Sequence, residues 1–276
     1  MKYKVIFSDI DGTLLTSDHR VSEGTIKVVE KIKEKGIKFI LVSARMPRGI
    51  IPIQKELSIN APIICFSGAL ILGEENNAGK RDIIFNTYIK VVDVRQIYNL
   101  IKDDFKDISF SLYQKDQWFV GSKEDEWAKI ESQITSSDPT FHDFDLLLES
   151  TELQINKILC IAKPYRIDAL NYKLKEIFPH LTISKSKDTY LEIMGSKVLK
   201  SSAIKTLEKV FKFHREEMLA IGDNFNDMDM LIYAGYGIAM GNSPNEVKAI
   251  ADDITGSNDE DGVKQALEKH ILMVLR

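Results

Sequence analysis

Short apolar runs alternate with amphipathic stretches in the first third of the chain, and this rhythm returns after residue 200. Val5–Phe7, Ile37–Val42 and Ile63–Phe66 have the length and composition of buried strands. Between the first two, Ser22 is a candidate N-cap for an amphipathic helix that Gly36 would end. The order strand, helix, strand, helix, strand is typical of a parallel sheet with crossover helices. The sequence therefore predicts an α/β fold.

The pattern changes in the middle of the chain. From residue 83 to residue 190, strand-like and helical pieces occur without the regular α/β alternation, and Asn76–Gly79 predicts a turn just before them. A length of 276 residues fits about two domains. We expect residues 1–82 and 191–276 to form a core and residues 83–190 to form an inserted α+β domain.

Composition excludes several classes of protein. Apolar residues make up 44% of the chain and charged residues 28%, which is typical of a globular protein. The net charge of −4 gives no bulk attraction to nucleic acids or anionic membranes, so we expect neither as a partner. Cys65 and Cys160 lie in separate apolar runs, which predicts buried, reduced thiols. Without a signal peptide or a long apolar run, the chain is expected to be cytoplasmic.

Acidic residues directly follow two of the expected strands. Asp9 and Asp11 come after the first strand, and Asp223 and Asp227 follow a late strand that ends at residue 221. Each cluster alone could be a solvated turn or a helix cap. If both strands belong to one parallel sheet, their carboxyl ends share an edge, where the carboxylates can converge on Mg²⁺. The two clusters together therefore predict a metal site for phosphate chemistry.

Two smaller signals agree with a phosphate site, and other motifs are missing. Ser43 follows a strand and offers a hydroxyl group, and Lys200 begins a helical segment where a cation could stabilise phosphoryl charge. An EF-hand fails because Thr13 and Leu14 occupy its fifth and sixth positions. The chain also has no Walker A or GxSxG motif and no paired histidines, which excludes P-loop NTPases, serine hydrolases and zinc hydrolases.

Four segments in order resemble the four motifs of the haloacid dehalogenase superfamily, and above all its Cof-type phosphatase branch. They are Asp9-Ile10-Asp11-Gly12-Thr13-Leu14, Ser43 after a strand, Lys200, and Gly222-Asp223-Asn224-Phe225-Asn226-Asp227. The resemblance implies a Rossmann-like core with an α/β cap inserted between the second and third motifs. One departure is Ser67, which stands where this branch usually has Asn, and which could alter substrate choice.

The resemblance also implies roles for the acidic residues. Asp9 would be the nucleophile and form an aspartyl-phosphate. Asp11 would protonate the leaving alcohol and then activate water. Mg²⁺ would be held by Asp9, the backbone carbonyl of Asp11, and Asp223, with Asp227 in support.

The remaining implied site residues bind phosphate. They are Ser43, Lys200, Asn226 and the backbone around Ile10 and Ala44. We therefore expect a Mg²⁺-dependent phosphatase acting on a small phosphorylated metabolite, with a sugar phosphate, a nucleotide and a cofactor phosphate all open. The alternatives are a sugar phosphomutase with the same phosphoaspartate and a non-catalytic regulator that binds a phospholigand.

Overall fold

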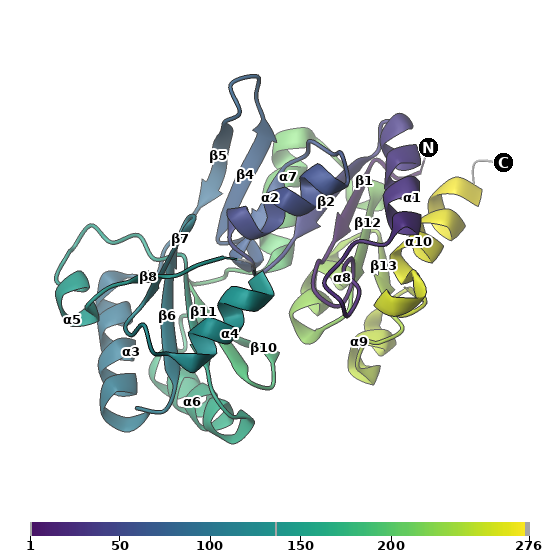
Figure 1. The fold of residues 1–276 in the computed structure, drawn as a ribbon. Coiled ribbons are helices and arrows are strands. Elements are labelled where there is room, and N and C mark those ends of the chain that lie inside the picture. The colour runs from purple at the N-terminus through teal and green to yellow at the C-terminus, as the bar shows by residue number, and fades with distance from the viewer. Residues whose placement is uncertain (1, 136, 274–276) are drawn as a thin grey trace. The chain divides into compact units, whose positions relative to one another are not determined.

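The computed structural model describes residues 2–135 and 137–273, which form two compact units (Figure 1). Of the described residues, the first unit contains 2–45, 50–85 and 199–273, and the second contains 46–49, 86–135 and 137–198. In the sequence, the second unit is therefore inserted into the first.

The first unit is built on an eight-stranded sheet with the order β14-β13-β12-β1-β2-β3-β4-β5. Its strands are β1 (Val5–Ser8), β2 (Lys38–Val42), β3 (Ile63–Cys65), β4 (Leu70–Glu75), β5 (Arg81–Asn86), β12 (Met218–Gly222), β13 (Tyr236–Ala239) and β14 (Asp253–Ile254). Its helices are α1 (Glu23–Glu34), α2 (Pro47–Glu56), α7 (Lys200–Phe211), α8 (Met228–Tyr233), α9 (Asn245–Ile250) and α10 (Gly262–Leu267). The predicted α/β class is confirmed.

The centre of this sheet is parallel, and its strand order reverses beside β1. β1 pairs in parallel with β2 on one side and with β12 on the other, so Val5 lies opposite both Lys38 and Met218. A reversal of this kind opens a crevice at the carboxyl ends of the strands, where α/β proteins bind ligands. The acidic segments that follow β1 and β12 both begin at this edge.

The edge beyond β3 differs from the expected parallel arrangement. β3 pairs antiparallel with β4, which is followed by β5, so the sheet is mixed. The predicted turn at residues 76–79 lies between β4 and β5, where Gly79 N donates to the Asn76 carbonyl. The sequence pattern does not predict these two strands, and β5 extends past the expected domain boundary at residue 82.

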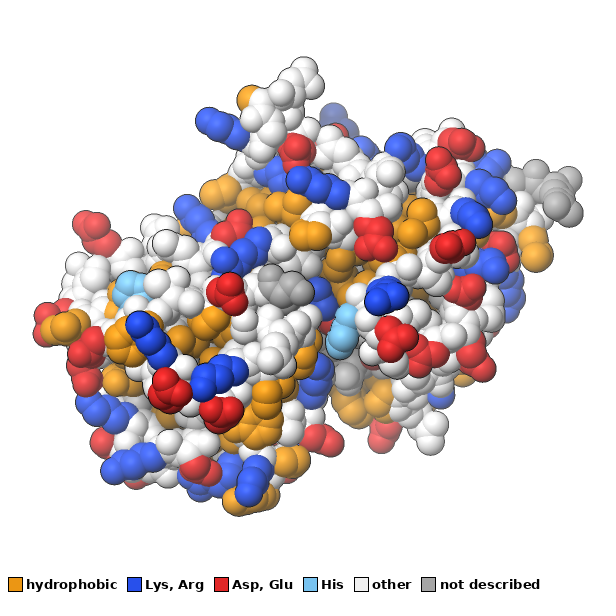
Figure 2. All heavy atoms as spheres, viewed as in Figure 1, with side chains coloured by type: hydrophobic (Ala, Val, Ile, Leu, Met, Phe, Trp, Pro, Cys, Tyr) orange, Lys and Arg blue, Asp and Glu red, His pale blue; other side chains and the backbone are white. Residues whose placement is uncertain are grey.

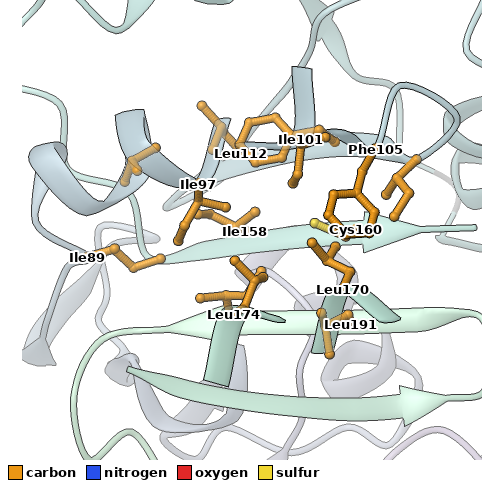
Figure 3. Packing of buried hydrophobic residues seen from close by; sticks show 14 of the residues in the cluster. Ile89, Ile97, Ile101, Phe105, Leu112, Ile158, Cys160, Leu170, Leu174 and Leu191 are labelled. Atoms are coloured by element: carbon orange, nitrogen blue, oxygen red, sulfur yellow. The ribbon is translucent and has the colours of Figure 1, made fainter. Parts of the chain in front are cut away.

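The second unit contains a six-stranded sheet with the order β10-β11-β9-β6-β7-β8. Its strands are β6 (Ser109–Gln114), β7 (Gln117–Val120), β8 (Thr140–Phe141), β9 (Lys157–Ile161), β10 (Thr182–Lys187) and β11 (Tyr190–Met194). Its helices are α3 (Val91–Asp104), α4 (Glu126–Thr135), α5 (Phe144–Leu147) and α6 (Pro164–Ile177). One face of the sheet packs in a hydrophobic core with residues of α3 and α6, including Ile97, Ile158 and Leu174 (Figure 3).

The observed boundaries of the second unit differ from the expected 83–190. β11 pairs antiparallel with both β9 and β10, so it belongs to the second sheet, and the chain returns to the first unit only at Leu199. The expected core segment 191–276 therefore begins too early. Sequence periodicity did not show this, because a buried strand has the same local pattern in either sheet.

The cap of α1 and the burial of the two cysteines agree with the sequence. The Ser22 side chain caps α1 by accepting a hydrogen bond from Thr25 N. Cys65 and Cys160 are both buried, and the two thiols form no disulfide among the described residues. Among the described residues, no helix combines the length and apolar character needed to cross a membrane. Acidic and basic side chains are interspersed on the visible face of the molecule (Figure 2).

Candidate active site

The loop after β1 is folded tightly against the end of β12. The Ile10 carbonyl accepts hydrogen bonds from Thr13 N and Leu15 N, at 3.4 and 2.9 Å. Gly12 adopts a positive φ of 81°, and a Cβ atom there would lie 2.5 Å from Asp223 Oδ2. A side chain at position 12 would therefore both strain the backbone and displace Asp223.

The segment after β12 places two carboxylates by local hydrogen bonding. Asp227 Oδ2 accepts hydrogen bonds from Asp223 N and Asn224 N, each at 3.0 Å. A Cβ atom at Gly222 would lie 2.6 Å from the Asp227 Cβ atom, so only glycine allows this close turn. Asp223 Oδ1 in turn accepts a hydrogen bond of 2.7 Å from the Thr13 hydroxyl. The ends of β1 and β12 are thus joined through side chains as well as through the sheet.

Lys200 is the first residue of α7, and its side chain is fully buried. Its Nζ lies 2.5 Å from Asp9 Oδ1 and 2.5 Å from Asp227 Oδ1. Burial of a single charge is costly, but two carboxylate partners offset that cost for the ammonium group. Lys200 therefore holds together two acids that are more than 200 residues apart in the sequence.

Three carboxylates form a cluster at the carboxyl edge of the sheet. Oxygen atoms of Asp9, Asp223 and Asp227 all lie within 4.8 Å of one another. Their three negative charges face one ammonium, that of Lys200, so the cluster has excess negative charge. Oxygen donors with excess negative charge at this spacing fit a hard divalent cation. The predicted convergence of the two acidic segments is therefore observed.

The charge crowding changes the pKa values of the cluster. Burial, together with the neighbouring Asp227, raises the pKa of Asp9 well above its usual range, despite the opposing effect of Lys200. Burial and Asp227 also raise the pKa of Asp223 to about 7. For Lys200, burial lowers the pKa, but the carboxylates of Asp227 and Asp9 outweigh it and the net pKa is raised. Without a bound cation, the cluster therefore favours uptake of a proton.

Asp11 lies outside this cluster and forms an ion pair that the sequence did not indicate. Arg45 Nε and Nη2 donate to the two carboxylate oxygens of Asp11, at 2.8 and 2.6 Å. Arg45 N also donates to Ser43 Oγ at 3.1 Å. Because the Asp11 carboxylate faces Arg45, its side chain is not one of the clustered acids. The local signal for this pair is the position of Arg45 at the same strand end as Ser43, two residues further along the chain.

Apart from Lys200, the expected phosphate-binding residues lie in the segments that follow strands β1, β2 and β12. Ile10, Ser43 and Ala44 lie in the loops after β1 and β2, and Ser43 is buried. The Ser43 carbonyl accepts a hydrogen bond of 2.9 Å from Ser67 N, which ties this loop to the turn after β3. Asn226 lies in the 3-10 turn between β12 and α8. These four residues belong to the first unit, at the ends of strands β1, β2 and β12, and the fifth, Lys200, begins α7.

Asn242 is a further loop-positioning residue without an assigned role in the sequence analysis. Its Nδ2 donates to the Gly12 carbonyl at 2.8 Å, and its Oδ1 accepts from Asn258 N at 3.1 Å. The loop after β13 thereby fixes the loop after β1. Its contact with Gly12 spans 230 residues, so no local sequence pattern indicates it.

We expect the effect of Mg²⁺ on stability to depend on pH. Since the pKa of Asp223 is raised to about 7, the metal-free folded protein keeps a proton that the unfolded chain releases near pH 4. The contribution of this proton to the stability of the folded protein is therefore greatest below the pKa of the unfolded chain. It is lost as pH rises to about 7. Above this pKa the Asp223 carboxyl group is already ionised, so Mg²⁺ displaces no proton from it when it binds. Thermal unfolding should then show a larger Mg²⁺-dependent increase in Tm one pH unit above 7 than one unit below it.

The control for this prediction is Asp223→Asn, in which both the pH dependence and the Mg²⁺-dependent increase should shrink. An equal increase in Tm on both sides of the Asp223 pKa would contradict this picture of the cluster.

Comparison with known proteins agrees with this geometry. Residues 6–267 match the family of haloacid dehalogenase-like hydrolases. A Haemophilus influenzae protein named as a candidate phosphatase is 38% identical over 269 residues, covering 98% of each chain. The Bacillus subtilis 5-amino-6-(5-phospho-D-ribitylamino)uracil phosphatase YitU is 25% identical, covering 96% of this chain and 97% of its own. A solved haloacid dehalogenase-like hydrolase from Bacteroides thetaiotaomicron has a TM-score of 0.85 at 27% identity, with 97% and 99% coverage.

The matched segment extends through both acidic clusters and the inserted unit, so the resemblance is to the whole architecture and not to one motif. The clustered acids also agree with a divalent metal site of this family. The chain belongs to the haloacid dehalogenase-like hydrolase family, in its Cof-type branch, and is a phosphatase of small phosphate esters.

Proposed function

We propose that this protein hydrolyses a small phosphate monoester with Mg²⁺ through a phosphoaspartate at Asp9. The observation that carries the proposal is the buried contact of Asp9 with Lys200 beside Asp223 and Asp227. A carboxylate that attacks a phosphate dianion needs nearby positive charge, because otherwise the two anions repel each other. Mg²⁺ held by Asp9 and Asp223 would supply that charge and keep both groups ionised.

The residues of the chain account for each bond that changes. An oxygen of Asp9 forms a bond to phosphorus while the ester oxygen leaves, and Asp11 donates a proton to that oxygen. In the second step Asp11 takes a proton from water, which attacks phosphorus and releases inorganic phosphate and the Asp9 carboxylate. The Lys200 ammonium stays charged throughout and offsets charge on the phosphoryl oxygens.

Asp227 supports this chemistry without reacting. One of its oxygens contacts Lys200, and the other accepts two backbone N–H groups. These contacts fix the position of the Lys200 ammonium and of the Asp223 backbone. We therefore assign Asp227 a positioning role, in agreement with the supporting role that the family resemblance implies.

The experiment that tests the function is a phosphate-release assay with Mg²⁺ over sugar phosphates, nucleotides and cofactor phosphates. Hydrolysis predicts one inorganic phosphate per molecule of substrate consumed. A phosphomutase would instead give an isomeric phosphate ester, and a phospholigand-binding regulator would bind esters without consuming them. The Asp11 carboxylate favours hydrolysis over mere binding, since a binding protein has no use for an acid beside a nucleophile.

Asp11→Asn is expected to slow hydrolysis most for esters that have poor leaving groups. Loss of the proton donor should lower kcat/KM for an alkyl phosphate by about 10² to 10⁴-fold, because general acid catalysis contributes that much. p-Nitrophenyl phosphate has a good leaving group, which needs little help from a proton donor. Its kcat/KM should therefore fall less. Parallel kinetics on the two substrates measure the difference, and an equal loss on both would contradict the role of Asp11 as the acid.

A further inference from the structure

Asp11 lies in the loop that follows β1 and not in a helix or a strand of the sheet. Its backbone forms an isolated β-bridge with Leu15, a buried residue of the same loop. A loop is less firmly held than a strand inside a sheet. The position of Asp11 therefore depends on the contacts that this loop makes with other segments of the first unit.

Two carbonyl groups close to Asp11 are each held by the side chain of an asparagine. Asn242 Nδ2 donates to the Gly12 carbonyl at 2.8 Å, and Asn258 Nδ2 donates to the Leu15 carbonyl at 3.0 Å. Gly12 is the chain neighbour of Asp11, and Leu15 is its bridge partner. The two asparagines thus hold the loop at two points that adjoin Asp11.

The two asparagines are also bonded to each other, because Asn258 N donates to Asn242 Oδ1 at 3.1 Å. The Asn242 amide therefore donates with its NH₂ group to a carbonyl and accepts with its oxygen from an N–H. These two partners fix the orientation of the amide, since only NH₂ can donate and only the oxygen can accept. We call Asn242 and Asn258 the asparagine pair.

The segments that carry the asparagine pair are tied to the end of β12. Met240 N donates to the Gly222 carbonyl at 3.0 Å, directly before Asp223 in the chain. Gly241 N donates to the Gly256 carbonyl at 2.9 Å, which joins the loops after β13 and β14. Backbone hydrogen bonds between neighbouring strand ends therefore support the asparagine pair from the side of the acidic cluster.

Asp259, the residue after Asn258, holds the same loop further from Asp11. Its two carboxylate oxygens accept from Ser17 N and Ser17 Oγ, each at 2.7 Å. Both residues are exposed, so water competes for these hydrogen bonds. Leu15, in contrast, is buried and adjoins Asp11 through the β-bridge. The asparagine pair is therefore the better candidate for control of the Asp11 position.

We propose that Asn242 and Asn258 are positioning residues, which hold the Asp11 backbone where its carboxyl group reaches the leaving oxygen of the ester. The inference rests on the proposed function, in which Asp11 is the proton donor. All the groups involved belong to the first unit. General acid catalysis needs a donor within hydrogen-bond distance of the leaving oxygen, so a small displacement of the loop slows proton transfer.

The test compares benzyl phosphate, which has a poor leaving group, with p-nitrophenyl phosphate, which has a good one. Asn242→Ala and Asn258→Ala should each lower kcat/KM by about tenfold for benzyl phosphate and by less than about threefold for p-nitrophenyl phosphate. In an Asp11→Asn background, the same substitutions should leave the ratio of the two kcat/KM values unchanged. The reason is that the group which the asparagine pair positions is then missing.

Asn60→Ala is the matched control, since Asn60 makes the same two kinds of hydrogen bond elsewhere in the first unit. Its Nδ2 donates to the Glu75 carbonyl and its Oδ1 accepts from Glu75 N, each at 2.8 Å. Asn60 precedes β3 whereas Asp11 follows β1, and both strands pair in parallel with β2, so the two residues lie at opposite edges of the sheet. Asn60→Ala should lower Tm about as much as the test variants and leave the ratio unchanged.

An equal loss on the two esters, or a lower Tm with an unchanged ratio, would overturn the positioning role. If an alanine variant does not fold, Asn258→Asp takes its place, because it keeps the size of the side chain and loses the donor to the Leu15 carbonyl. It should change the ratio in the same direction, and an unchanged ratio in this folded variant would overturn the inference. A wild-type protein that releases phosphate from no ester would instead contradict the proposed function.

Discussion

Asp9→Asn is expected to abolish turnover, with kcat falling by roughly 10⁴-fold or more. The amide cannot form an acyl phosphate, because it has no anionic oxygen with which to attack phosphorus. The variant should still fold, because an asparagine side chain at this position can accept from the Lys200 ammonium in place of Asp9. Its metal-free Tm should equal or exceed the wild-type value, since one charge leaves a crowded cluster.

The measurement is phosphate release from p-nitrophenyl phosphate with Mg²⁺, together with Tm. Asp18→Asn provides a matched control, because Asp18 is an exposed aspartate in the loop after Asp9. The control should keep wild-type activity. If Asp9→Asn retained more than about a hundredth of wild-type kcat, a different group would have to be the nucleophile.

Lys200→Met is expected to remove both activity and stability. Methionine has a similar length but no charge, so Asp9 and Asp227 would be left buried without their cation. Breaking a buried ion pair typically costs about 3 to 5 kcal/mol, which for a chain of this size is a fall in Tm on the order of 10 °C. Activity should fall with it, because the phosphoryl group loses its fixed positive charge.

The double variant Lys200→Met/Asp227→Asn separates the two effects. The amide oxygen introduced at position 227 can still accept the backbone N–H groups of Asp223 and Asn224, and one uncompensated charge is gone. We therefore expect part of the lost Tm to return while activity stays low. Recovery of activity together with stability would show that Lys200 acts only through folding and not on the phosphoryl group.

The acidic cluster could be predicted because its members carry a local signal. Asp9 and Asp223 each follow a short buried run, and the α/β alternation predicts that such strand ends share one edge of a sheet. The first-unit strands β1, β2 and β12 are where the sequence predicts them. Periodicity and strand-end chemistry are properties of a few consecutive residues, so they can be read without the fold.

Other features depend on contacts between distant segments and had no local signal. The Asp11–Arg45 pair joins the loops after two different strands, and Asn242 reaches Gly12 across 230 residues. The assignment of β11 to the second sheet likewise depends on its antiparallel partners β9 and β10. Nothing in the composition of these segments specifies the partner, which is decided by pairing in the folded chain.

The most direct test of a nucleophilic Asp9 is chemical trapping of the reaction intermediate. The protein would be mixed with Mg²⁺ and ³²P-labelled substrate, quenched in acid during turnover, and the labelled peptide identified by mass spectrometry. We predict an acid-stable, hydroxylamine-sensitive phosphate on the peptide that contains Asp9, which is absent in Asp9→Asn. Rapid phosphate release with no labelled peptide, or with the label on another residue, would contradict this role of Asp9.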